Sequence, residues 1–181
     1  MSAAILGLSG SPRAGGNTDI VVRRVMEGVA EKTGRDANFV RVADFELRHC
    51  AGCRQCMTLG RCAIGGDDLD EIMSYLFAAQ ILVIGSPVYW NSPPGIMKDF
   101  MDRSHGWYTD HTILAGKRAA IISIATGGGF ASHEDALESW LTCYGAQVAH
   151  KARIYACEKA EVLDRPGELR KLDRVIAALA A

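Results

Sequence analysis

A glycine-rich stretch near the N-terminus has the residue types of a phosphate-binding loop. The stretch GLSGSPRAGGNT (7–18) directly follows an apolar run and precedes a helical pattern. Glycines at 10, 15 and 16 permit a tight backbone, and a helix start presents N–H groups with partial positive charge. We therefore expect this loop to bind phosphate. The side chains that would contribute hydroxyls, an amide or a charge are Ser9, Ser11, Arg13, Asn17 and Thr18.

Two better-known phosphate loops do not fit this stretch. A Walker A loop requires G-x-x-x-x-G-K-[ST], and the stretch contains no lysine. A dinucleotide-binding fingerprint requires G-x-G-x-x-G, which the glycines at 7, 10, 15 and 16 do not form. A glycine-rich turn with an Asn or Thr cap is the alternative to a phosphate site. The order of strand, loop and helix favours the phosphate.

A second stretch, HCAGCRQCMTLGRC, has the cysteine spacing C-x2-C-x2-C-x5-C. Cysteines this close are typical of iron–sulfur sites, whereas structural zinc sites usually combine two separated C-x-x-C pairs. The fourth cysteine does not have the ferredoxin spacing, and alanine rather than proline follows it. A zinc site, a redox-active thiol pair and unligated cysteines stay open as alternatives. The candidate ligands are Cys50, Cys53, Cys56 and Cys62.

Alternating apolar patterns predict the elements that position these residues. Strands are expected at 3–8, 38–42, 81–85, 119–125 and 148–156, and helices at 18–32, 67–78, 95–103, 132–144 and 166–180. This alternation predicts a single α/β domain over 1–181, a flavodoxin-like three-layer sandwich with a five-stranded parallel sheet of order 2-1-3-4-5. Two long segments interrupt this alternation of strands and helices: a cysteine-rich insertion at 44–66 and a loop at 104–117.

Two further loops follow the strands of this sheet, at the edge where such folds bind ligands. The first, GSPVYWNSPPG (85–95), places Tyr89 and Trp90 where aromatic side chains can wall a flat ring, although plugging the core is the alternative. The second, ATGGGFASH (125–133), has three glycines that let the backbone approach a ligand closely. A phosphate and a planar ring together describe FMN.

These segments resemble the NADPH-dependent FMN reductase superfamily of flavodoxin-like proteins. The matching residues are GSPRAGGNT (10–18), IGSPVYWNSPPGIMKDFMDR (84–103) and TGGG (126–129), in the order of the family. The resemblance implies that Ser9, Ser11, Arg13, Asn17 and Thr18 hold the FMN phosphate. It further implies that the isoalloxazine is lined by Pro87, Val88, Tyr89, Trp90 and Asn91 and that the site is closed by Thr126, Gly127 and Gly128.

The cysteine spacing and the following GGDDLDEI resemble the iron–sulfur flavoprotein branch of this superfamily, whose members carry FMN and a [4Fe–4S] cluster. The resemblance implies an oxidoreductase that passes electrons from NAD(P)H or a reduced carrier, through FMN, to a quinone, a flavin or another small acceptor. An electron carrier with FMN and a cluster, reduced by ferredoxin, is the second hypothesis. A zinc-stabilised interaction module without flavin is the third. Relatives are commonly homodimers or homotetramers.

Other features of the sequence narrow the function. The net charge is −1 without a basic cluster, which argues against nucleic acid, and no apolar run is long enough to span a membrane. The start lacks signal-peptide features, so we expect a cytoplasmic protein. No acid–base constellation stands out, as expected where a flavin carries the chemistry.

Several smaller expectations concern single residues. Lys98/Asp102 and Asp99/Arg103 have the spacing of ion pairs on one helix face. Cys143 and Cys157 stand apart from the cysteine run and are expected to be buried. Trp107 and Tyr108 are expected to be exposed near a subunit interface, with packing on their own subunit as the alternative.

Overall fold

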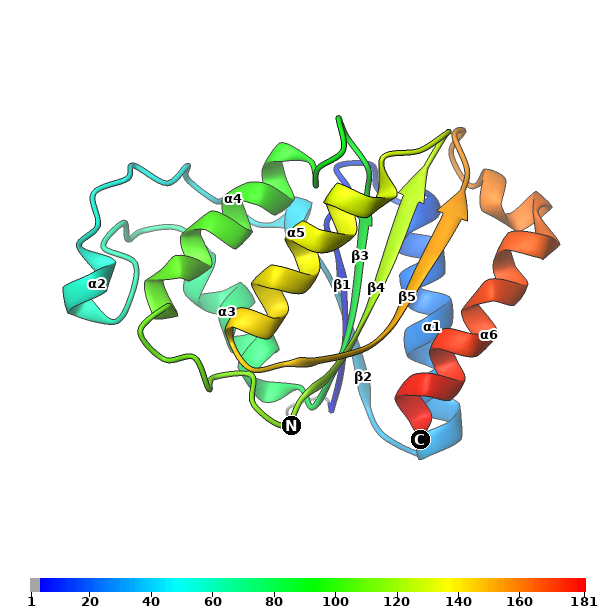
Figure 1. Cartoon of the computed structure of the whole chain (residues 1–181), viewed down its shortest axis with the longest axis horizontal. Coiled ribbons are helices and arrows are strands. Elements are labelled where there is room, and N and C mark those ends of the chain that lie inside the picture. The colour runs from blue at the N-terminus through cyan, green and yellow to red at the C-terminus, as the bar shows by residue number, and fades with distance from the viewer. Residues whose placement is uncertain (1–3) are drawn as a thin grey trace.

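A five-stranded parallel sheet forms the middle layer of the computed structural model, which describes residues 4–181 (Figure 1). The strand order is β2-β1-β3-β4-β5, which confirms the predicted flavodoxin-like order. Each predicted strand is present, with ends that differ by a few residues, and residue 3 lies outside the described part. The strands are β1 Ile5–Ser9, β2 Ala37–Arg41, β3 Ile81–Pro87, β4 Arg118–Ala125 and β5 Gln147–Tyr155.

Helices cover both faces of the sheet, as predicted (Figure 1). One face carries α1 Asn17–Thr33 and α6 Pro166–Ala180, and the other carries α3 Leu69–Ala78, α4 Gly95–Ser104 and α5 Phe130–Cys143. The patterns did not predict the short elements, which have too few residues to show a period. They are η1 Val42–Asp44, α2 Cys56–Leu59, η2 His105–Trp107 and η3 Glu161–Asp164.

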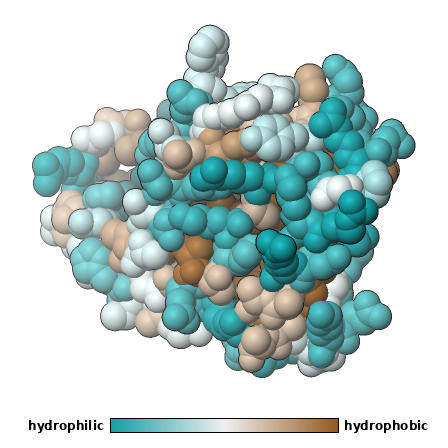
Figure 2. Space-filling view, turned by 45° about the vertical axis from the view of Figure 1, so that its right-hand side comes forward, coloured by the Kyte–Doolittle hydropathy of each residue, from teal (hydrophilic) through white to brown (hydrophobic). Residues whose placement is uncertain are grey.

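Two apolar cores, one on each face of the sheet, hold the layers together. Alternate residues of β3 serve both, because Leu82 and Ile84 face α3–α5 while Ile81 and Val83 face α1 and α6. The surface in Figure 2 is largely hydrophilic, with apolar side chains in small separate patches. None of the helices in residues 4–181 is long and apolar enough to cross a membrane.

Close packing of α1 on β3 sets the position of the glycine-rich loop. A Cβ atom at Gly85 would lie 2.2 Å from Val22 Cγ2 and 3.1 Å from Thr18 Cγ2. Only glycine therefore allows the first turns of α1 to approach the carboxyl end of β3. This contact brings the start of α1 next to the loop that follows β3.

The long loop at 104–117 packs on its own chain. Trp107 meets Phe77 edge to face, with ring centroids 5.8 Å apart, and Tyr108 stacks on His105 at 4.5 Å. Both side chains are half-buried, and Leu114 in the same loop is fully buried. The prediction of exposed aromatics at 107–108 is therefore wrong, and these two residues give no support to a subunit interface.

Candidate functional site

Segments that follow four of the strands converge at the carboxyl edge of the sheet and line a cavity of about 190 Å³. Its walls come from the glycine-rich loop, the loop after β3, Thr126 after β4, and Ala156–Cys157 after β5. Typical small-molecule pockets measure about 300–1,000 Å³, so this cavity is smaller than a whole nucleotide needs. Eight of the predicted cofactor residues line it: Ser11, Arg13, Asn17, Thr18, Pro87, Val88, Tyr89 and Thr126.

The start of α1 at this cavity is suited to bind an anion. The N-cap residue is Gly16, and no side chain caps the helix. The first N–H groups of a helix have no partner within it, and the helix dipole gives them partial positive charge. Gly16 and the next two residues all line the cavity. An oxyanion placed there would satisfy these donors.

The buried carboxylate of Asp19 supports the glycine-rich loop from below. It accepts hydrogen bonds from Ser9 Oγ at 2.5 Å and from the Gly15 N–H at 2.7 Å, and it lies 3.0 Å from Arg41 Nε. Ser9 thus donates its hydroxyl hydrogen to Asp19 and does not line the cavity. Asp19 and Arg41 were not among the residues predicted for the site. The one sequence feature that could have pointed to this contact is Asp19 itself, a carboxylate in the first turn of the helix.

Side chains of the loop also join it to the segment that follows β5. Asn17 donates its amide to Glu158 O at 2.8 Å and accepts the Val162 N–H at 3.1 Å, while Arg13 Nη1 donates to Cys157 O at 3.2 Å. Asn17 keeps one amide hydrogen for a ligand. Cys157 is exposed and lines the cavity, so the prediction that it is buried is wrong.

The predicted wall for a flat ring is a tight turn after β3. Tyr89 and Ser92 exchange backbone hydrogen bonds of 2.8 and 3.0 Å, and the two residues between them have positive φ: 51° for Trp90 and 62° for Asn91. Such φ is rare for a bulky residue and costs on the order of 1–3 kcal/mol. Tyr89 is 46% exposed beside the cavity, whereas Trp90 is 100% exposed and does not line it.

The three glycines after β4 differ in whether the fold itself requires glycine at their positions. Gly129 has a φ of 82°, and a Cβ atom there would lie 2.4 Å from Asn91 Oδ1. Gly127 and Gly128 have ordinary φ, and a Cβ atom at either would meet no atom within 4 Å. The fold itself thus requires glycine only at 129. The glycines at 127 and 128 fit a backbone that a ligand approaches.

One histidine below this edge carries no charge at neutral pH. His133 on α5 is fully buried, and its Nδ1 lies 3.0 Å from Ser123 Oγ on β4. Burial lowers the pKa of His133 to about 4, so the ring is neutral at pH 7. We conclude that it supports the strand ends beneath the loops.

The four predicted ligand cysteines line one cavity of about 580 Å³, together with Cys143 and His105. The donor set is thus rich in thiols, which suits an iron–sulfur cluster or zinc. Within residues 4–181, however, no three Cys, His, Asp or Glu side chains lie close enough together to hold a metal. Cys143 is half-buried in this cavity wall, so its predicted full burial is also wrong.

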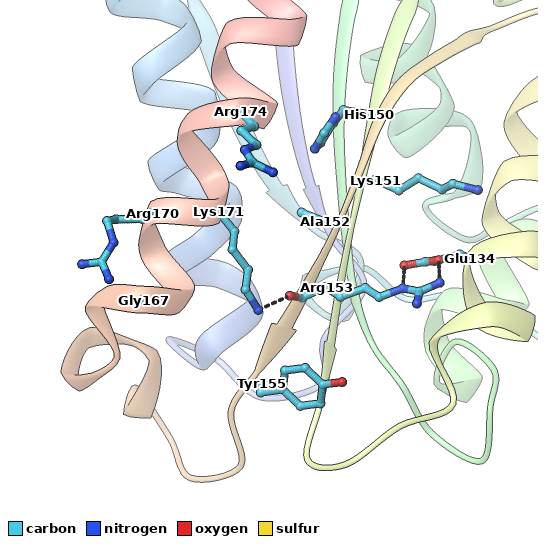
Figure 3. Close-up of a pocket in the computed structure, with 10 residues that line it drawn as sticks. All are labelled: Glu134, His150, Lys151, Ala152, Arg153, Tyr155, Gly167, Arg170, Lys171 and Arg174. Carbon is cyan, nitrogen blue, oxygen red and sulfur yellow. Dashed lines mark hydrogen bonds and ion pairs between the residues drawn. The ribbon is translucent and has the colours of Figure 1, made fainter.

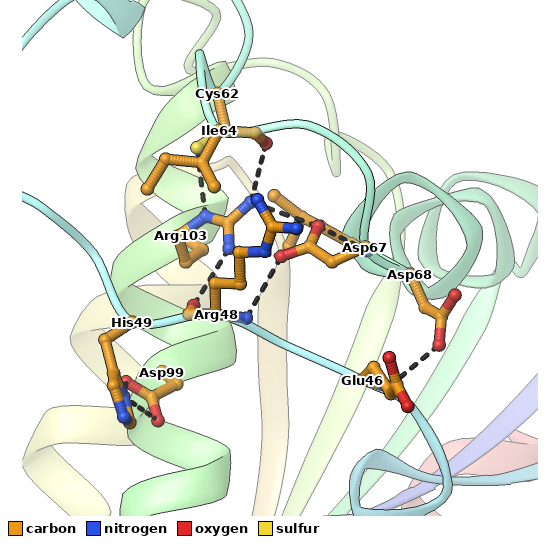
Figure 4. Close-up of polar contacts among 10 residues, drawn as sticks. Glu46, Arg48, His49, Cys62, Ile64, Asp67, Asp68, Asp99 and Arg103 are labelled. Carbon is orange, nitrogen blue, oxygen red and sulfur yellow. Dashed lines mark hydrogen bonds and ion pairs between the residues drawn. The ribbon is translucent and has the colours of Figure 1, made fainter.

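A buried arginine fixes both ends of the cysteine segment (Figure 4). All five N–H donors of Arg103 are used. Its Nη atoms contact Asp67 at 2.7 and 3.2 Å, Arg48 O at 2.8 Å and Ile64 O at 2.9 Å, and its Nε donates to Cys62 Sγ at 3.0 Å. The segment from Arg48 to Asp67 is therefore closed around one guanidinium.

These contacts correct one predicted ion pair on α4. Lys98 pairs with Asp102 as predicted. The predicted pair of Asp99 with Arg103 is wrong, because Arg103 faces inward to Asp67 and Asp99 meets His49 Nδ1 at 2.9 Å. Arg103 thus pairs with a buried carboxylate that is distant in the sequence and not with the carboxylate one turn away on α4.

A larger groove of about 670 Å³ lies away from these loops, between β5 and α6. Figure 3 shows that its cations come from both walls, with Arg153 on β5 and Lys171 and Arg174 on α6. Arg153 pairs with Glu134 and Lys171 with Glu168, each at 2.7 Å. These pairs neutralise part of the basic charge, and the groove contains none of the predicted site residues.

The comparison with protein families agrees with this geometry. Residues 3–160 match the family model described as NADPH-dependent FMN reductase. The chain belongs to this family. The match confirms the expected family and supports FMN as the cofactor.

Individual relatives are similar over parts of their length. An iron–sulfur flavoprotein of Methanocaldococcus jannaschii is 42% identical over 100 residues, 55% of this chain and 51% of that protein. One of Methanosarcina thermophila is 30% identical over 143 residues, 78% of this chain and 74% of that protein. The chain thus spans about half the length of several curated relatives that it matches.

Solved structures confirm the fold. An apo structure of an NADH:FMN oxidoreductase has a TM-score of 0.66 at 19% identity and covers 99% of this chain and 91% of that one. The azoreductase AzrA has a TM-score of 0.69 at 14% identity and covers 97% and 98%.

The open space at Gly128 allows a test of the cofactor site. We predict that Gly128→Ala weakens FMN binding about tenfold, because the added methyl would take up space that the proposed ring needs beside this loop, while the free energy of unfolding changes by less than about 1 kcal/mol. Flavin fluorescence titration and urea unfolding measure the two quantities. Gly65→Ala, which also meets no atom within 4 Å, is the matched control. Unchanged FMN affinity in Gly128→Ala would contradict the assignment.

The Arg103 network makes a prediction about stability and pH. Asp67→Asn should destabilise the protein by about 3–5 kcal/mol at pH 7, because it leaves a buried guanidinium without its counter-ion. The hydrogen bond from Arg103 lowers the pKa of Asp67. Asp67 therefore contributes stability above its usual pKa of about 3.9, and this is lost as the pH falls through the lowered folded value.

Urea unfolding of wild type and variant between pH 2 and 7 measures this difference. The gap between them should shrink only in the acidic part of that range. Asp102→Asn, which breaks the exposed pair with Lys98, is the control and should cost at most about 1 kcal/mol. Equal losses in the two variants would contradict the anchoring role of Asp67.

Proposed function

We propose that the protein is an FMN-dependent oxidoreductase that takes electrons from NAD(P)H and passes them to a small acceptor such as a quinone or a flavin. One observation carries the proposal: the segments after β1, β3, β4 and β5 meet at the sheet's carboxyl edge around the uncapped start of α1. The family match supports it. When bound, FMN would supply the hydride and electron chemistry.

The residues of this chain would then bind and orient the cofactor. The N–H groups at the start of α1, with the hydroxyls of Ser11 and Thr18, would hold the phosphate, and Arg13 would add its charge. Tyr89 and the backbone of the loop after β3 would lie along the ring. Gly127 and Gly128 would leave room for its other side. Ser9 and Asp19 would hold the loop in shape without touching the ligand.

We further propose that Cys50, Cys53, Cys56 and Cys62 hold a metal centre, with a [4Fe–4S] cluster as the first candidate and zinc as the second. The thiol lining of one cavity supports this, as do the names of the relatives. Because no three of these thiols lie close enough for a metal among the described residues, some of them would have to come closer together when the metal binds. With a cluster present, an electron carrier reduced by ferredoxin becomes the alternative function.

The assembly and location of the protein are also proposals. A homodimer or homotetramer would give the fully exposed Trp90 a surface to cover it. A cytoplasmic location fits the six cysteines, all unpaired in residues 4–181, because reducing compartments keep thiols in this state.

Stopped-flow spectroscopy separates the enzyme from the carrier. We predict that NADPH or NADH bleaches the bound flavin in a rapid phase and that a quinone restores its absorbance. Bleaching by reduced ferredoxin alone would overturn the proposed NAD(P)H-dependent reaction in favour of the carrier. Protein that cannot be loaded with FMN would contradict both.

A further inference from the structure

Helix α4 links the cofactor loops to the cysteine segment. It begins at Gly95, directly after the loop that follows β3, and its ten residues span about 15 Å. Near its start, Met97 packs so closely on Gly10 of the glycine-rich loop that a Cβ atom there would lie 2.8 Å from Met97 Cγ. Its last turn and the adjoining η2 carry the residues that touch two of the cysteines.

Cys62 is held through both its side chain and its backbone. The fully buried guanidinium of Arg103 donates to its sulfur at 3.0 Å, and Arg103 cannot turn away, because its other four N–H groups are also bonded. A Cβ atom at Gly106 would lie 2.4 Å from the Cys62 backbone nitrogen. The turn after α4 is therefore shaped to receive Cys62.

Cys56 is contacted by His105, which follows Arg103 by two residues. His105 Nδ1 lies 3.4 Å from Cys56 Sγ. The imidazole stacks on Tyr108 with an angle of 5° between the rings, which fixes the direction of that nitrogen. Cys56 begins α2, and α2 packs on η2.

In the described part of the chain, the other two candidate ligands are not held by neighbouring side chains. Cys50 and Cys53 are exposed, and neither sulfur has a hydrogen-bond partner among the described residues. Positive φ angles occur at Gly52, between the two cysteines, and at Arg54, directly after Cys53, with values of 63° and 58°. The thiols of the segment thus form an anchored pair and an unanchored pair.

We propose that Arg103 and His105 are positioning residues that hold Cys62 and Cys56 as the preformed half of the metal site, onto which Cys50 and Cys53 close. This inference rests on the proposed metal-binding role of the four cysteines. Ordering side chains costs free energy, so a pair that is already ordered binds metal more tightly. N–H donors to metal ligands typically contribute 10- to 100-fold in affinity.

Anaerobic titration with Co²⁺ alone tests the proposal, with thiolate-to-metal absorption as the readout and FMN-loaded full-length protein as the sample. His105→Ala should weaken Co²⁺ binding about 10- to 100-fold. His105→Asn should restore most of the affinity, because its amide nitrogen can replace Nδ1 as a donor. His111→Ala is the control, since His111 meets Cys143 rather than the four candidate ligands.

A second variant tests Arg103, the residue that contacts Cys62. Arg103→Lys keeps the positive charge but cannot make five directed hydrogen bonds, so it should weaken Co²⁺ binding at least tenfold while FMN still binds. If this variant does not fold, the His105 series still decides. Wild-type affinity in His105→Ala, or no recovery in His105→Asn, would overturn the inference.

The outcomes distinguish this inference from the proposed function. If wild-type protein binds neither Co²⁺ nor iron, the metal site itself is wrong and this inference falls with it. FMN binding in the same samples tests the flavin proposal separately. Equal Co²⁺ affinity in wild type, His105→Ala and Arg103→Lys would leave the metal site standing and overturn the positioning roles alone.

Discussion

The buried carboxylate of Asp19 is the contact on which the candidate cofactor site depends. It holds the Ser9 hydroxyl, the Gly15 N–H and the Arg41 guanidinium at once, and so closes the glycine-rich loop onto the ends of β1 and β2. A carboxylate beneath a phosphate site would repel the ligand unless its charge were balanced. Arg41 supplies that balance, and the uncapped N–H groups of α1 stay available for an anion.

The site and the cysteine segment share one frame. Parallel strands bring the loops after β1, β3 and β4 to the same edge, and Gly85 lets α1 approach that edge closely. Helix α4 runs from there to the cysteines, where Arg103 closes the segment. The GGDD stretch has a structural explanation in this frame, since Asp67 binds Arg103 and Asp68 accepts the Glu46 N–H at 2.8 Å. Its carboxylates are hydrogen-bonded within the fold.

Much of the fold could be predicted from the sequence, because apolar periodicity reports which faces are buried. The same pattern placed the loops at one edge, and eight of the predicted residues line the cavity there. Contacts between distant residues could not be predicted in this way. Arg41 pairs with Asp19 because the register of β1 and β2 sets Ser9 beside Arg41. Arg103 pairs with Asp67 and not with Asp99, because the Arg103 side chain is buried. Cys157 lines the cavity because β5 lies next to β4 in the sheet, so the segment after β5 reaches the same edge.

We propose that the start of α1 and its loop bind the phosphate of FMN, and the rest of the proposed function depends on this contact. Calorimetric comparison of FMN with riboflavin, which lacks the phosphate, tests it most directly. We predict that FMN binds about 100-fold more tightly than riboflavin, a difference of roughly 2.7 kcal/mol, as several charge-assisted hydrogen bonds to the phosphate would provide. Equal affinity for the two flavins would contradict it.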